Sequence, residues 1–83
     1  MQRIFKYELN PISASAEMPE KAEVISAAFQ GDALCVWAVV DEAAPLETVK
    51  FAVVPTGHAI IDNSIKFINT VFLDTYVFHV FKI

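Results

Sequence analysis

Glycine is scarce in this chain, which has only two, Gly31 and Gly57, and they stand far apart. Loops that cradle phosphate groups need several glycines close together, so that backbone amides can approach the phosphate. The sequence therefore contains neither a P-loop nor a dinucleotide-binding fingerprint. A hydrolase nucleophile elbow would read Gly-x-Ser-x-Gly, and no serine here has those neighbours.

Metal-ligating and nucleophilic side chains are also few. There is one cysteine, Cys35, and there are two histidines, His58 and His79. One cysteine excludes an intrachain disulfide, and a zinc site needs about four clustered ligands, so we expect no metal and no cofactor. Cys35 lies in the apolar run "ALCVWAVV", where it reads as a buried small side chain rather than a nucleophile. An ordinary enzyme is disfavoured.

Positive charge is thin as well, with six Lys or Arg residues, no basic stripe and a net charge of −4. Binding to nucleic acid through phosphates is therefore not expected. No apolar run reaches the ~20 residues of a membrane span, and the first residues lack a signal-peptide core. These absences lead us to expect a soluble, cytoplasmic protein with no membrane partner.

Hydrophobic residues, by contrast, make up 55% of the 83-residue chain, and ten residues are aromatic. The length indicates one domain, residues 1–83. A chain this short buries only about 60–65% of its unfolded surface, so its core is thin. Because apolar surface in excess of the core marks interfaces, we expect a homo-oligomer, most simply a dimer.

Alternating apolar residues and turn signals predict strands along most of the chain. In "RIFKYEL", residues 3–9, Phe5, Tyr7 and Leu9 share a face. "SASAEMP" reads as extended, with Pro19 at an edge or strand end. "TVKFAVV" (48–54) is another strand, and "HAII" begins a short return strand that ends at Asp62-Asn63-Ser64. "KFINTVFLD" and "TYVFHVFKI" close the chain around Asp74-Thr75, and one alternating set is predicted to share a face: Phe67, Asn69, Val71 and Leu73.

The segment around Gly31-Asp32 carries the strongest turn signal and also an ambiguity. Glycine at the first central position suits a type II′ turn between "EVISAAFQ" and "ALCVWAVVD". The second run is apolar on both faces, which predicts a central, buried strand containing Trp37. The same stretch, "PEKAEVISAAFQG", has helix signals: Pro and acids early, and Gly just after its end. We favour the strand interpretation, and the helix remains the alternative.

Six to eight short strands at regular spacing predict an all-β domain. With so few glycines for sharp bends, we expect a small antiparallel sandwich or a half-open barrel rather than a tight closed barrel.

The turn "PTGH" offers the most suggestive polar groups. The Thr56 hydroxyl, the Gly57 backbone and the His58 ring could converge on a small ligand, with Tyr76 or Trp37 as an aromatic wall. The alternative is a hairpin corner that binds nothing. His79, in "VFHVF", is expected to be a half-buried histidine with a backbone partner.

Taken in order, "IFKYEL", "EMPEKAEVIS", "LCVWAVVD", "PTGHAI" and "VFHVF" resemble a family of short, uncharacterised phage and prophage proteins. The resemblance covers nearly the whole chain and rests on the ordered set. The family's turn begins with glycine where this chain has Pro55, which has no N–H to offer a ligand. The resemblance implies a phage or prophage source and action in the host cytoplasm.

The function that these observations favour is non-enzymatic. It is an accessory protein that binds a host protein or sequesters a small host ligand, such as a defence signal. Two alternatives stay open: a virion or assembly component, and a small hydrolase of a signalling nucleotide with His58 as general base.

Overall fold

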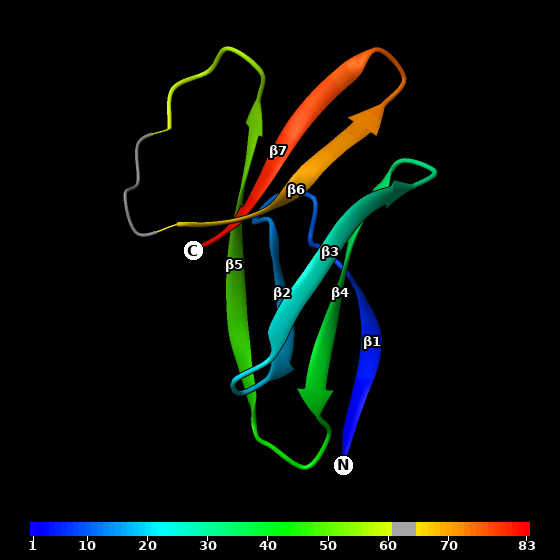
Figure 1. Ribbon diagram of the computed structural model, residues 1–83, viewed down its shortest axis with the longest axis vertical. Coiled ribbons are helices and arrows are strands. Elements are labelled where there is room, and N and C mark those ends of the chain that lie inside the picture. The colour runs from blue at the N-terminus through cyan, green and yellow to red at the C-terminus, as the bar shows by residue number, and fades with distance from the viewer. Residues whose placement is uncertain (61–64) are drawn as a thin grey trace.

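Strands make up nearly all of the regular structure in this computed structural model, which describes residues 1–60 and 65–83 (Figure 1). Within that part of the chain there is no helix, and so none that could cross a membrane. The seven strands are β1 (Gln2–Glu8), β2 (Ser15–Pro19), β3 (Glu23–Gln30), β4 (Ala33–Asp41), β5 (Leu46–Pro55), β6 (Lys66–Leu73) and β7 (Tyr76–Lys82).

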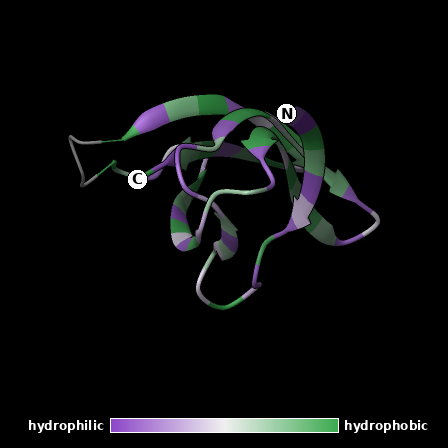
Figure 2. Cartoon of the chain, turned by 90° about the horizontal axis from the view of Figure 1, so that it is seen from below, coloured by the Kyte–Doolittle hydropathy of each residue, from purple (hydrophilic) through white to green (hydrophobic). Residues whose placement is uncertain are grey.

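The strands form two antiparallel sheets. One has the order β1-β4-β3, and the other has the order β2-β5-β7-β6. Figure 2, viewed from below, shows hydrophobic and hydrophilic residues alternating along the strands, as expected when one face of each sheet packs on the other sheet. The all-β sandwich predicted from the sequence is confirmed.

The β3–β4 hairpin settles the ambiguity between strand and helix. Gln30 pairs with Ala33, so Gly31 and Asp32 form a two-residue turn. Gly31 has a φ of 63°, and Asp32 is not among the residues with positive φ. This combination is the pattern of a type II′ turn, which matches the twist of the flanking strands. The strand interpretation of residues 23–30 is therefore correct, and the helical alternative is wrong.

The core lies between the sheets and consists of alternate residues of each strand. On β4 the inward residues are Val36, Ala38 and Val40, all at most 1% exposed. The opposite face of β4 carries Cys35, which is buried, and Trp37, which is only half-buried. The expectation that Trp37 is interior was wrong: β4 is central within its sheet, but the second sheet covers only one of its faces.

A β-bulge in β6 corrects the predicted alternation of that strand. Phe67 pairs with Phe81 and Asn69 pairs with the adjacent Val80, so Ile68 is the extra residue. Because the bulge adds one residue, the side chains before it point to the opposite face of the sheet from the face that regular alternation predicts. Phe67 therefore lies on the outer face of its sheet, opposite to Asn69, and its ring meets that of Phe81 edge-on at 5.5 Å between centroids.

Asn69 links the two sheets. Its Oδ1 accepts a hydrogen bond from the Ala27 backbone N–H at 2.6 Å, and its Nδ2 donates to the Ala27 carbonyl at 2.8 Å. Ala27 lies on β3, at the edge of the other sheet. One side-chain amide thus pairs with the edge of β3 as a peptide group of a neighbouring strand would. This contact joins the β3 and β6 edges of the sandwich.

The short return strand predicted after Gly57 is not found. Residues 58–60 have no strand structure, and the remainder of the prediction, Ile61 to Ser64, lies outside the described residues. The strand that pairs with the end of β5 is instead β7, through Val54–His79 and Pro55–Phe78. Because that edge of β5 is already occupied by β7, residues 58–60 do not pair along it.

Candidate functional site

A pocket opens between the two sheets at the end of the sandwich where the β3–β4 hairpin turns. Its volume is about 400 Å³. Small-molecule sites in proteins start at about 300 Å³ and favour such concave, apolar positions. We call it the mouth pocket. Its lining comes from the β1–β2 loop, the β3–β4 hairpin and one residue of β5: Glu8, Leu9, Asn10, Pro11, Ala14, Phe29, Asp32, Ala33, Leu34 and Val53.

The loop that forms one wall of the mouth pocket is held by its own hydrogen bonds. The Asn10 Oδ1 accepts from the backbone N–H groups of Ile12 and Ser13, at 2.9 and 3.1 Å. The Ala14 N–H donates to the Asn10 carbonyl at 2.8 Å, and the Ala14 carbonyl accepts from Phe51 on β5 at 2.9 Å. These bonds tie the loop to both itself and the neighbouring sheet. The wall is therefore formed in advance of any ligand.

The charge around the mouth pocket has one sign. Among the residues that the structure describes, Glu8 and Asp32 are the two charged residues of its lining, and none of the lining residues is Lys, Arg or His. Both side chains are exposed to solvent, so their carboxylates are hydrated at the rim. Most of the other lining residues are apolar. The arrangement suits a ligand with an apolar body and a positive or neutral polar end, and it disfavours an anion.

Aromatic rings extend outward from one side of the pocket. Phe29, a lining residue, lies 6.0 Å from Phe78 of β7 between ring centroids, and Phe78 stacks on Tyr76 at 6.3 Å. Tyr76 is exposed. The three rings make a row that runs from the pocket toward the β6–β7 turn. Such rows offer flat apolar contact to a ligand that projects out of the pocket.

The turn predicted as a binding site, Thr56-Gly57-His58, lies at the end of β5 on the molecular surface. The His58 N–H donates to the Pro55 carbonyl at 3.1 Å, and Gly57 has a φ of 92°, a conformation that favours glycine. His58 also lines a cavity of about 370 Å³ beside the last residues of β5. The turn is real and has a cavity next to it, and its role in binding stays a prediction.

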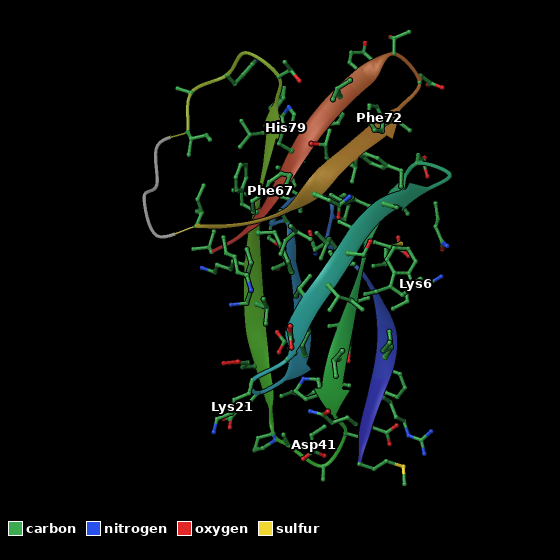
Figure 3. The ribbon with its side chains drawn as sticks, in the orientation of Figure 1. Lys6, Lys21, Asp41, Phe67, Phe72 and His79 are labelled. Carbon is green, nitrogen blue, oxygen red and sulfur yellow. The ribbon has the colours of Figure 1, made fainter. Side chains whose placement is uncertain are left out.

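Thr56 is not among the residues that line the cavity beside His58; it belongs to a row of polar side chains around His79, which Figure 3 labels on β7. Its hydroxyl lies 2.8 Å from His79 Nε2, and the Thr70 hydroxyl lies 2.9 Å from His79 Nδ1. The backbone partner expected for His79 is therefore replaced by two threonine hydroxyls, one on β6 and one in the turn that follows β5. Since both ring nitrogens are engaged, His79 acts as a bridge between strands rather than as a free base.

The aromatic residues proposed as walls do not gather at this turn. Tyr76 begins β7 and stacks on Phe78, on the sheet face opposite to that of Thr56 and Val77. Trp37 lies on the outer face of the other sheet, opposite Lys6 of β1. Of the five predicted site residues, only Thr56, Gly57 and His58 lie together, and they do so because they are consecutive.

Neither the mouth pocket nor any other place in residues 1–60 and 65–83 brings together three His, Cys, Asp or Glu side chains that could hold a metal ion.

The mouth pocket was missed in the sequence because its residues come from three separate segments. The sequence offered one usable signal, a pair of turns. The turn at 10–14 follows the first strand, and the turn at 31–32 precedes the apolar strand that begins at residue 33.

The mouth pocket and the small β-sandwich by themselves define no activity, and comparison with known proteins names a family but no activity either. The chain belongs to the family described as "Domain of unknown function (DUF7352)", whose model matches residues 1–83. No match is found among curated proteins or among solved structures.

Proposed function

We propose that this protein is a stoichiometric binding module that holds a small ligand in the mouth pocket without turning it over. The observation that carries the proposal is the pocket itself. It has about 400 Å³ of space between the sheets, a largely apolar lining and carboxylates as its charged groups. The ligand class that fits is a compact apolar or amphipathic molecule with a neutral or cationic end.

Two features support binding rather than chemistry. The hydrogen bonds within residues 10–14 hold the wall in place, which reduces the ordering cost of binding. The lining also lacks a nucleophile and base in contact, the arrangement that covalent catalysis needs.

The resemblance to short phage and prophage proteins suggests the setting. We propose that the chain acts in the cytoplasm of a bacterial host and that the host supplies the ligand, either as a free small molecule or as a side chain of a host protein. An anionic signalling nucleotide fits the acidic rim poorly. A cationic or uncharged ligand is the better candidate.

The proposal is tested with two probes of equal chain length and opposite charge, hexyltrimethylammonium and hexyl sulfate. Chemical shifts of the ¹⁵N-labelled protein are followed in a titration with each. We expect the cation to shift the amides of Leu34 and Val53, and we expect hexyl sulfate to bind more weakly. Equal binding of both probes, or shifts confined to other residues, would contradict the assignment.

Matched variants locate the charge effect. The double variant Glu8→Gln with Asp32→Asn should weaken binding of the cation by about 2- to 30-fold, because each exposed ion pair contributes roughly 0.2–1 kcal/mol. Glu23→Gln is the control, since Glu23 is an exposed acid that begins β3, at the end of the strand away from the hairpin turn. An unchanged affinity in the double variant would show that the carboxylates do not contribute.

A further inference from the structure

The four strands at the ends of the two sheets are β1, β3, β2 and β6. An edge strand exposes unpaired backbone groups and can therefore pair with another chain. Proteins protect such edges with bulges, prolines, short strands or charged side chains. A comparison of the four edges shows which one is unprotected.

Three of these edges carry a protective feature. The strands β3 and β6 each contain a bulge, between Val24 and Ser26 and between Phe67 and Asn69, and Asn69 joins these two edges. The strand β2 is only five residues long and ends in Pro19. In contrast, β1 pairs with β4 over seven consecutive residues with no bulge, and it contains no proline or glycine.

The two cations of β1 would protect its edge only if they projected across it, and both are held by the chain itself. The Lys6 Nζ donates to Gln30 Oε1 at 2.8 Å. Gln30 lies on β3, and β4 lies between β1 and β3, so this bond ties Lys6 to the far strand of its own sheet. The Arg3 Nε pairs with Glu42 Oε1 at 2.9 Å. Neither charge is left to repel an approaching strand.

Apolar surface surrounds this edge. Ile4 is 60% exposed on the outer face of β1, and Phe5 is 39% exposed although it points toward the interior side of the sheet. The second sheet therefore does not cover β1 as it covers β4. Two large apolar side chains, one on each face, are exposed at the unprotected edge. Exposed apolar residues beside an open strand edge are typical of a pairing surface.

We propose that β1 pairs with β1 of a second copy of this chain and joins two three-stranded sheets into one six-stranded sheet. The Leu9 N–H donates to the Leu34 carbonyl on β4. Backbone direction alternates along a strand, so Gln2, Ile4, Lys6 and Glu8 direct their N–H and carbonyl groups to the free edge. These four residues supply up to about eight hydrogen bonds across a symmetric antiparallel pair.

The charges select the register. With Phe5 opposite Phe5 of the second copy, the whole of β1 is paired, and the cross-strand neighbours are Ile4 with Lys6, Arg3 with Tyr7, and Gln2 with Glu8. No like charges are opposed in this register. Centring the pair on Lys6 would place two ammonium groups face to face, and centring it on Ile4 would put Tyr7 opposite Met1, outside the strand, and leave Glu8 unpaired. The sequence of β1 is therefore self-complementary about Phe5.

The oligomeric state is measured by light scattering and sedimentation over a range of micromolar concentrations. We expect a species of twice the 9.2 kDa chain mass. Ile4→Pro removes an N–H that faces the free edge and leaves the hydrogen bonds to β4 intact, so it should yield a folded monomer. A wild-type protein that stays monomeric throughout this range, or a dimer that persists in folded Ile4→Pro, overturns the proposal.

Cysteine cross-linking checks the register independently of that variant. In a Cys35→Ala background the introduced cysteine is the sole thiol, and glutathione disulfide is the oxidant. Residues opposite each other in a non-hydrogen-bonded pair have Cα atoms about 4.5 Å apart, within reach of a disulfide. Phe5→Cys should cross-link to a dimer, and Ile4→Cys, which faces Lys6 of the second copy, should do so at least several-fold less. Equal cross-linking of both variants, or of neither, contradicts the register.

Discussion

Replacing Asn69 by alanine should destabilise the protein far more than the loss of one polar side chain ordinarily does. The substitution removes the hydrogen-bond partners of both the N–H and the carbonyl of Ala27, a residue only 2% exposed. Each buried backbone group left unsatisfied costs roughly 1–3 kcal/mol, which gives about 2–6 kcal/mol for the pair. A domain of this size has a total stability of about 4–12 kcal/mol.

Urea unfolding measures this loss directly, and the melting temperature should fall by roughly 10–50 °C, at about 4–8 °C per kcal/mol for a domain of this size. His79→Ala is the matched control. It also removes two cross-strand hydrogen bonds, but their partners are threonine hydroxyls that can rotate toward water. We expect the control to cost about 1 kcal/mol.

Two further measurements connect the loss to Ala27 itself. The Ala27 amide should exchange slowly in the wild type and rapidly in Asn69→Ala. In Asn69→Asp the carboxylate can accept from the Ala27 N–H but offers no donor to its carbonyl, and protonation in acid restores a donor. The deficit of that variant should therefore shrink as the pH falls. A loss below about 1 kcal/mol in Asn69→Ala, or an Ala27 amide that stays protected, would refute the reasoning.

Three other predictions concern the stability and reactivity of the fold. Burial, with a smaller contribution from Glu42, raises the pKa of Tyr7 above its ordinary value of 10.0. The unfolded chain ionises first, so stability that is complete below about pH 10 is lost as the pH rises through the folded pKa; thermal melts in Tyr7→Phe should lose less stability over that range. Cys35 is 2% exposed, so a thiol reagent should label it slowly in the native protein and quickly in denaturant. Trp37→Ala should cost less than the roughly 3–5 kcal/mol typical of a buried aromatic residue, as measured by urea unfolding, because the indole is half exposed.

The strands were predictable because their signals are local. Alternation marked β1 and β5, and the turn residues Gly31-Asp32 and Asp74-Thr75 marked the two tight hairpins. The position of Pro19 at the end of an edge strand followed from its missing N–H. In each case the residue type restricts its own backbone, so no knowledge of the partner strand was needed.

The features that the sequence did not reveal depend on distant partners. Asn69 bonds to a residue 42 positions away, and no neighbour of Asn69 in the sequence indicates this. The mouth pocket joins residues 8–14 to residues 29–34 and Val53, which only the topology brings together. We expected Trp37 in the interior because a strand of apolar residues has the same sequence pattern whether other elements pack on one of its faces or on both.

The bulge at Ile68 has a consequence for comparing members of this family. It lets the aromatic at position 67 and the amide at position 69 face opposite ways although they stand two residues apart. A relative of the same length without the bulge would follow regular alternation and turn that aromatic ring to the interior, whereas a relative one residue shorter would keep the ring opposite position 81 on the solvent side. The length of this segment and the presence of the bulge together decide whether a relative keeps the outer pair of rings formed here by Phe67 and Phe81.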